Sequence, residues 1–388
     1  MGYSTMPWLG FFIQPHFQGA YFDSTLVALS RWPSGFLPTL SIVQDPLDQE
    51  LKKQTFAQPI VFFRFNLSVL LRSPALSPAL TSLRLRIPCR PVARSLCSAA
   101  TAHDPSSLSS NLPLVNLEFL DLSTCGVLES EVDTIMVHFP SLQHLILDSC
   151  HIMRGDLREG EWNALGRRCA LVGVRRAKER EKVLKMWLES RTIVETAGSD
   201  APPGGNPDRK VKGGRKGLAT ATISFRKPDV NPPSLSRPLF SQKQVGQSKK
   251  SYSKIRVLPP ISRLVSLSIA LSSTHSPDKY PIIRAEFEEG WAEGVAVLAM
   301  TRSRLRTSAG NGVRVMKFTK SVMADEEVEY EEGLDGLENV DSIEISSEED
   351  RLSRQDPPIL CFAGPTRAGL HADNCGHSVG WVVMGDEM

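Results

Sequence analysis

The C-terminal region holds four residues of the types that bind transition metals. Cys361, His371, Cys375 and His377 stand within 17 positions, and thiolate sulfur with imidazole nitrogen is a common ligand set for structural zinc. Their spacing, C-x9-H-x3-C-x-H, is not a usual zinc-site spacing, and Cys375 and His377 are too close in sequence for an easy tetrahedron. The sequence therefore favours a C-terminal tail without a metal or other cofactor, with structural zinc as the alternative.

Motifs of enzyme chemistry are absent from the sequence. It contains no GxxxxGK[ST], no HExxH, no GxSxG and no GxGxxG after an expected strand. The glycine-rich stretch 213–217 stands in a segment without a neighbouring strand or helix to direct its amides. We therefore expect a protein that is not an enzyme.

A nine-residue phrase, LxxLxLxxC, occurs twice, at 117–125 and at 142–150. The two copies begin 25 residues apart, within the period of about 20–29 residues found in leucine-rich repeats, which share this signature. Each copy predicts a short buried strand, followed by a cysteine buried at the turn.

The segment between the two copies is predicted to be a helix. Its apolar residues recur at helical spacing, at Val132, Ile135, Met136 and Phe139. Pro140 then ends the helix before the second copy. Weaker matches to LxxLxL lie at 37–42, 60–65, 80–85, 264–269, 313–318 and 340–345.

These phrases resemble the leucine-rich-repeat half of F-box proteins, a family with large sets in fungi. The resemblance is specific over 114–150 and looser over 36–90 and 258–347. It implies a horseshoe with cysteine-containing, ribonuclease-inhibitor-like repeats that recruits targets to a ubiquitin ligase. Residues 1–36 contain nothing similar to the Leu-Pro-x-Glu that opens an F-box. Only the target-binding half is therefore carried over, and an adaptor of the ligase is not an expected partner.

The fold class that we expect is α/β, a leucine-rich-repeat solenoid interrupted by a long basic helix and a disordered linker. The expected parts are an irregular N-terminal segment at 1–35, a first repeat block at 36–153, a basic amphipathic helix at 154–197, a disordered linker at 198–253, a second repeat block at 254–347 and a C-terminal tail at 348–388.

Charge is unevenly distributed along the chain. Residues 154–256 contain 24 Lys and Arg against 10 Asp and Glu, whereas 321–350 contain 13 Asp and Glu and no Lys or Arg. A basic arm of this kind makes a nucleic-acid-associated factor the alternative function. Glutamates interleave with the basic residues of the helix, which favours a solvated helix face and a charged linker instead.

Bulk composition indicates a soluble protein of the cytoplasm or nucleus. The chain has 388 residues, of which 41% are apolar, and a formal net charge of +2. Its seven cysteines are an odd number without paired spacing, which indicates reduced thiols. No secretory signal and no apolar run of membrane-spanning length is visible, so no membrane partner is expected.

Binding of an unidentified protein partner is the expected function. If the leucines face inward, the residues between them line the opposite, concave face. These candidate contacts are Arg84, Arg86, Phe119, Asp121, Ser123, His144, Ile146 and Asp148. Two alternatives remain: that these side chains only pair with each other across strands, and that the chain is a degenerate gene product without selected activity.

Overall fold

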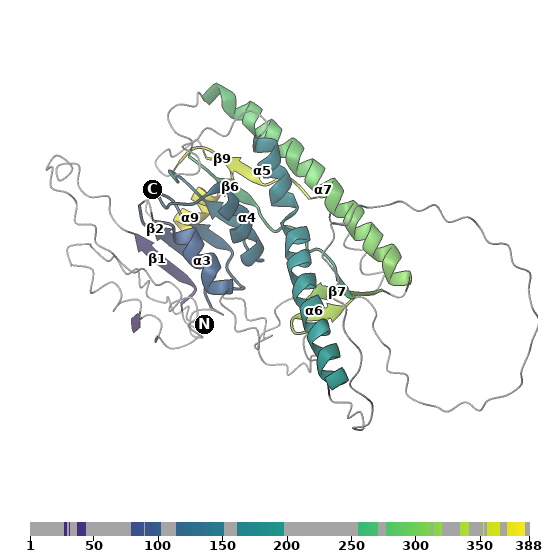
Figure 1. Cartoon of the computed structure of the whole chain (residues 1–388). Coiled ribbons are helices and arrows are strands. Elements are labelled where there is room, and N and C mark those ends of the chain that lie inside the picture. Colours follow the sequence, from purple (N-terminus) through teal and green to yellow (C-terminus); the bar gives the residue numbers. More distant parts are fainter. Residues whose placement is uncertain are drawn as a thin grey trace, which may run out of the picture. The chain divides into compact units, whose positions relative to one another are not determined.

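Six short strands form one parallel sheet in the order β1-β2-β3-β4-β6-β9 (Figure 1). The strands are β1 Thr39–Val43, β2 Ser82–Arg86, β3 Phe119–Asp121, β4 His144–Ile146, β6 Ser266–Ser268 and β9 Ile359–Cys361. This computed structural model describes residues 27–28, 31, 37–43, 79–88, 90–101, 114–150, 161–197, 255–270, 277–311, 313–319, 334–340, 352, 355–364 and 371–384. The predicted irregular segment 1–35, apart from three residues, the strand at 60–65 and the linker 198–253 lie outside the described residues.

A ladder of apolar residues runs across this sheet. The second residues of the six strands are paired in register, Leu40, Leu83, Leu120, Leu145, Leu267 and Leu360. The six leucines of the two full phrases are all buried, with Leu142 the most exposed at 4%. The predicted inward orientation of these leucines is therefore confirmed.

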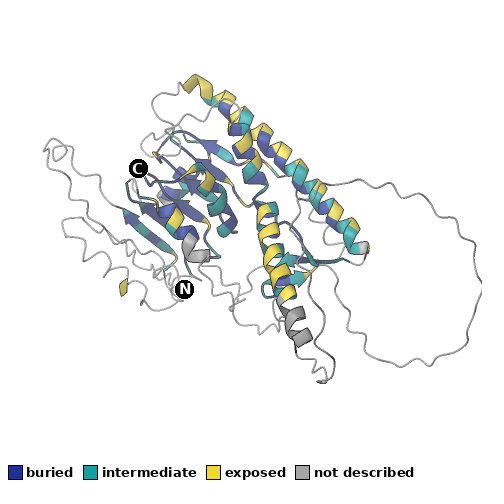
Figure 2. Ribbon diagram, in the orientation of Figure 1, coloured by how far each residue is buried: buried dark blue, intermediate teal, exposed yellow. Residues whose placement is uncertain are grey.

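Helices α3 (Val92–Thr101) and α4 (Glu129–His138) pack on the leucine side of the sheet, in one apolar cluster with the strands. Figure 2 shows the strands as the most completely buried part of this region. The α4 helix is the one predicted from the spacing of Val132, Ile135 and Met136. The backbone N–H of Leu128 donates to Oε2 of Glu131 over 2.8 Å, which satisfies a free amide at the N-terminus of α4.

The two repeated cysteines have the predicted role. Cys125 and Cys150 are buried, and their thiols donate to the carbonyl oxygens of Leu85 and Leu122 over 3.0 and 3.1 Å. Each bond joins the turn after one strand to the backbone at the end of the preceding strand in the sheet.

A second, smaller sheet contains β5 (Ile255–Val257), β7 (Arg314–Phe318) and β8 (Leu337–Asn339). The pair β5–β7 is parallel and the pair β7–β8 is antiparallel. Ala177 and Leu184 of helix α6 (Val172–Ala197) pack into its core. Of the strand expected at 340–345, Val340 alone is described, and it follows the end of β8.

Glycines let helices α5 (Glu161–Ala170) and α7 (Tyr280–Gly310) lie in close contact. A Cβ atom at Gly290 would overlap the carbonyl oxygen of Asn163, and one at Gly166 would overlap that of Phe287. The sequence predicted one long helix here, but the structure has α5 and α6 with a turn at Leu171 between them. The turn lets α5 pack on α7 while α6 packs against the second sheet.

The predicted leucine-rich-repeat solenoid is wrong. The structure has a parallel six-stranded sheet and a separate three-stranded sheet with one antiparallel pair. Along the chain, the 26-residue helix α6 separates β4 from β6, and the 31-residue helix α7 separates β6 from β9. The LxxLxL phrase specifies a short strand buried on its leucine side, but not the length or path of the chain to the next strand. Segments so unequal do not stack as repeats.

The chain divides into two compact units. One contains residues 188–252, and the other contains residues 1–187 and 253–388. Both sheets and helix α9 (Gly376–Met384) belong to the second of these. The region predicted as a C-terminal tail thus contains strand β9 and helix α9.

Candidate metal centre

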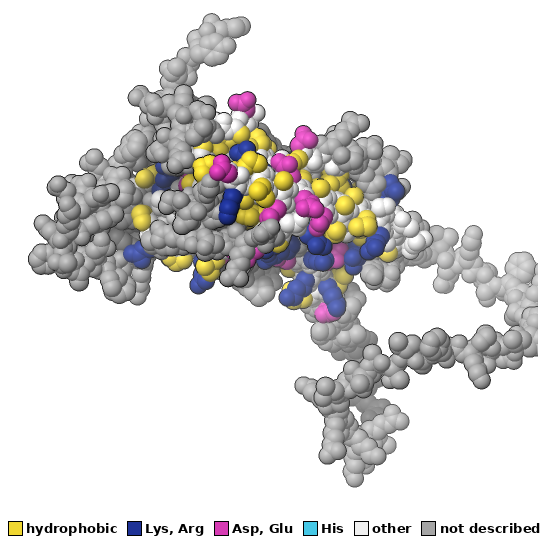
Figure 3. Space-filling view, turned by 90° about the horizontal axis from the view of Figure 1, so that it is seen from above, with side chains coloured by type: hydrophobic (Ala, Val, Ile, Leu, Met, Phe, Trp, Pro, Cys, Tyr) yellow, Lys and Arg dark blue, Asp and Glu magenta, His cyan; other side chains and the backbone are white. Residues whose placement is uncertain are grey.

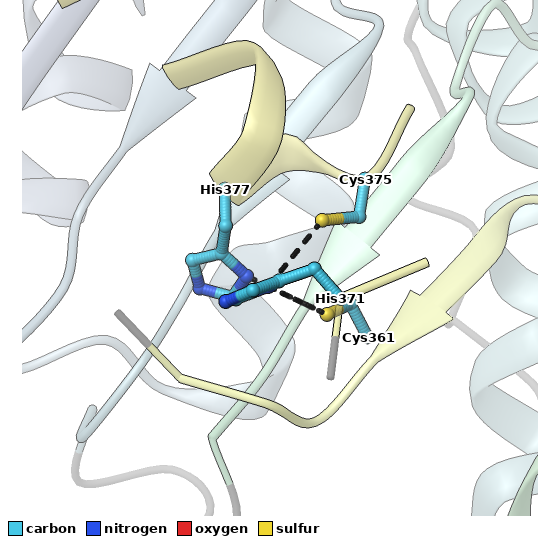
Figure 4. A group of neighbouring side chains, drawn as sticks. All are labelled: Cys361, His371, Cys375 and His377. Carbon is cyan, nitrogen blue, oxygen red and sulfur yellow. Dashed lines mark hydrogen bonds between the residues drawn. The ribbon is translucent and has the colours of Figure 1, made fainter. Parts of the chain in front are cut away.

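The four C-terminal cysteines and histidines come together at the edge strand of the six-stranded sheet (Figure 4). Cys361 is the last residue of β9, and His377 lies in the first turn of α9. Between them, Asn374 adopts a left-handed conformation with φ of 60°, and the amide of Cys375 donates to the carbonyl of Ala372 over 3.1 Å. This turn reverses the chain, so that it brings His371 back beside the cysteine and histidine that follow.

Three sulfur–nitrogen distances at the site match those between ligands of a tetrahedral metal ion. One ligand atom of each residue lies within 4.8 Å of all the others. The Sγ of Cys361 is 3.5 Å from Nδ1 of His377 and 3.6 Å from Nδ1 of His371, and Cys375 Sγ is 3.6 Å from the same His371 atom. Around a tetrahedral zinc ion, sulfur and nitrogen ligands stand about 3.6 Å apart.

The outer nitrogen of His377 is held by a buried carboxylate. Its Nε2 lies 2.5 Å from Oδ2 of Asp148, and the other carboxylate oxygen accepts the amide of Ala270 over 2.6 Å. The Nδ1 atom of His377 therefore points toward the two sulfurs. A carboxylate behind a histidine ligand in this way fixes the ring and makes it a stronger ligand.

Charge at the site favours a cation. The pKa of the Cys375 thiol is held below its ordinary value, first because the Cys361 thiol donates a hydrogen bond to it, and the same bond raises the pKa of Cys361. Burial alone would lower the pKa of His377, but its hydrogen bonds to Asp148 and Cys375 outweigh burial and raise that pKa to about 9. The Cys375 thiol and the Asp148 carboxylate are thus both hydrogen-bonded to His377.

Burial distinguishes a structural site from a catalytic one. Cys361, His377 and Asp148 also form a cysteine–histidine–carboxylate chain of the kind that activates a nucleophile. However, Cys361 and Cys375 are 1% and 0% exposed, so a substrate has no approach to either sulfur. Four protein ligands without an open position are the arrangement of structural zinc.

The sequence named these four residues but favoured a metal-free tail, because Cys375 and His377 are separated by one residue. The structure resolves that difficulty locally. Cys375 precedes α9 and His377 lies in its first turn, so the backbone bends between them and both side chains reach the same centre. Asp148 is the member that sequence spacing could not add, since it stands 229 positions away from His377.

The residues predicted to contact a protein partner lie side by side on the sheet face opposite the leucines, but most of them are buried. Phe119 pairs in register with His144, and Arg84 with Asp121. The Asp121 carboxylate accepts from Arg84 over 3.2 Å, from Arg86 over 2.9 Å and from Ser123 Oγ over 2.6 Å. In this structure they pair across strands, as the alternative expected. Their role in binding a partner stays a prediction.

Comparison of the chain with protein-family models, with curated proteins and with solved structures gives no match. Among the described residues, no helix combines the length and the apolar character needed to cross a membrane.

Proposed function

We propose that this chain binds one structural zinc ion through Cys361, His371, Cys375 and His377. The observation that carries the proposal is the sulfur–nitrogen separation of 3.5–3.6 Å among the ligand atoms of three buried residues and half-buried His371. Two thiolates and two imidazoles suit zinc better than magnesium or calcium, which prefer oxygen ligands. When bound, the ion supplies a cross-link between β9 and the segment that leads into α9.

The test is metal analysis of the full chain purified without a metal-affinity step. We expect one zinc per chain, and visible bands of tetrahedral coordination with a sulfur charge-transfer band after cobalt substitution. The double variant Cys361→Ser/Cys375→Ser should lose both, while Cys97→Ala, which lies in α3, should keep them. A folded parent chain without stoichiometric metal would contradict the proposal, as would a double variant that retains it.

A second proposal is that the chain binds another protein without catalysing a reaction. What supports it is the row of aromatic, polar and charged side chains on the non-leucine face of the sheet, a composition common at interfaces. A role in a ubiquitin ligase rested on the repeat resemblance and has no further support in the described residues.

The nucleic-acid alternative stays a prediction. Lys178 and Lys182 are exposed on α6, but Arg175 pairs with Glu179 over 3.2 Å on the same side of the helix. Figure 3 likewise shows basic side chains next to acidic ones on the face in view. Retention on heparin that falls steeply with salt would support this alternative.

A further inference from the structure

Helix α9 lies on the non-leucine face of the six-stranded sheet, in contact with β1, β4 and β6 (Figure 1). Two glycines set four positions apart make this approach possible. A Cβ atom at Gly376 would stand 3.0 Å from Cγ1 of Ile146, and one at Gly380 would stand 2.9 Å from the Phe119 ring. Larger residues at these positions would push the helix away from the strands.

The face beneath α9 has the character of an interface more than of a core. It combines Phe119 and Ile146 with the hydroxyls of Ser266 and Ser268, all of them buried. Ser266 is hydrogen-bonded to His144 Nδ1 over 2.9 Å, whereas the Ser268 hydroxyl has no hydrogen-bond partner among the described residues. Because an unsatisfied buried hydroxyl costs free energy, covering this face contributes less stability than an apolar core would.

The zinc ligands sit where they can hold α9 in place. Three of the four, His371, Cys375 and His377, belong to the segment that ends in this helix, and the fourth, Cys361, belongs to the sheet. A helix of nine residues is too short to be stable by itself in water. Without the metal, the contact depends on this short helix, on the hydrogen bond between His377 and Asp148 and on the weaker contacts of the Cys361 sulfur with the two histidines.

We propose that the sheet face of Phe119, His144, Ile146, Ser266 and Ser268 is an interaction surface gated by the metal. Its partner is an apolar helix with small residues four positions apart. In the zinc-bound chain α9 is the occupant, and loss of zinc frees the face for a helix of the same chemistry from another molecule. This inference rests on the proposed zinc site, and it adds that the ion controls whether α9 covers this face of the sheet.

The experiment uses the full chain, zinc-loaded or treated with a chelator. Hydroxyl-radical footprinting should give several-fold more labelling of Phe119 after chelation, reversed when zinc is restored. A fluorescent peptide of residues 371–384, added in excess, should bind the chelated chain and not the zinc-loaded one. A peptide with Gly376→Leu and Gly380→Leu is the matched control and should bind neither.

The Gly380→Leu variant of the full chain tests the gate without removing the metal. It should keep one zinc per chain and yet show raised labelling of Phe119. One bound zinc in the parent, with Phe119 equally protected before and after chelation, would overturn the gating and leave the zinc site standing. Binding of the control peptide as tightly as the parent peptide would overturn the proposed partner chemistry. A parent chain that binds no zinc would overturn both proposals.

Discussion

At the scale of single residues, Asp148 connects the repeated phrase to the candidate metal centre. It is the seventh residue of the second LxxLxLxxC copy, and it is buried between the amide of Ala270 and the ring of His377. The position equivalent to Asp148 in the first copy is Ser123, which instead donates to Asp121. The two copies thus differ at this position: the aspartate of the second copy orients the ligand His377, and the serine of the first copy does not.

Replacing Asp148 with Asn should weaken zinc binding without abolishing it. The amide keeps the size of the side chain but loses the charge that makes His377 a strong ligand. We expect zinc affinity to fall by about 10–100-fold, measured by competition with a chromophoric chelator. Asp133→Asn, a change in the α4 helix, is the control and should leave affinity unchanged. Equal affinities for parent and Asp148→Asn would show that Asp148 does not support the ligand.

Thiol reactivity should divide the buried cysteines into two groups. Burial first, and then the carboxylate of Glu131, raises the pKa of Cys97 to about 12, and burial likewise raises that of Cys169 to about 12. Since the thiolate is the reactive form, both should resist alkylation near neutral pH in the folded chain. Chelation should make Cys375 reactive, since its pKa is held below the ordinary value, and peptide mass spectrometry would reveal the alkylation. Rapid alkylation of Cys97 in the zinc-loaded chain would contradict the burial of α3.

At the scale of elements, the close contact of α5 with α7 depends on the absence of side chains. Gly290 faces the backbone at Asn163. Gly294 faces Ala170, and a Cβ atom added at Gly294 would stand 2.6 Å from the Cβ atom of Ala170. Trp291 and Phe287 fill the space beside these glycines and join the main apolar cluster. The contact therefore combines close backbone approach with aromatic packing.

Gly290→Ala should destabilise the protein although alanine favours helices. The new methyl group meets backbone atoms, which cannot rotate away, so the two helices must separate. Overpacking of this kind costs about 1–3 kcal/mol, against a gain of about 1 kcal/mol in helix propensity. Chemical denaturation would measure the net loss. Ala292→Ser, on the exposed side of α7, should change little. A variant at least as stable as the parent would contradict the α5–α7 packing.

Leu145→Ala tests the strand register. Leu145 is fully buried and pairs with Leu120 and Leu267 on its two sides. The cavity left by its side chain should lower the free energy of unfolding by about 2–5 kcal/mol. Met186→Ala on α6, where the side chain is 53% exposed, should be nearly neutral. Equal melting of the Leu145 variant and the parent would mean that the strand is not paired as described.

At the scale of the molecule, the chain leaves the six-stranded sheet after β4 and returns at β6, then leaves again and returns at β9. Strand β9 therefore lies at one edge of the sheet, and helix α9 packs on its non-leucine face. The metal centre lies at this edge, since its ligands come from β9 and the segment that leads into α9. Bound zinc should for this reason stabilise the whole unit.

The melting temperature should rise with free zinc. A ligand that binds only the folded state at about 100 times its dissociation constant adds about 2.7 kcal/mol of stability. Differential scanning calorimetry of the parent in zinc buffers should show this increase, and Cys361→Ser/Cys375→Ser should not respond. A response of equal size in the double variant would place the stabilising zinc elsewhere in the chain.

The sequence by itself determined the local features of this protein. The leucine spacing predicted the strands β1, β2, β3, β4 and β6 and their buried side, because alternation along a strand encodes which face is covered. The apolar spacing before Pro140 predicted α4, and the two phrases predicted buried cysteines at their turns. Each of these features depends on residues within one turn or strand.

Only the tertiary structure decided which distant segments meet. No periodicity indicated that β4 pairs with β6 across more than a hundred residues, or that β9 completes the sheet. The solenoid prediction failed for the same reason, since a local phrase does not fix the path between its copies. The metal centre likewise needed the turn at Asn374, the end of β9 and Asp148 from the turn after β4. Contacts of this kind follow from the packing of the whole chain, which the spacing of four ligands in sequence does not contain.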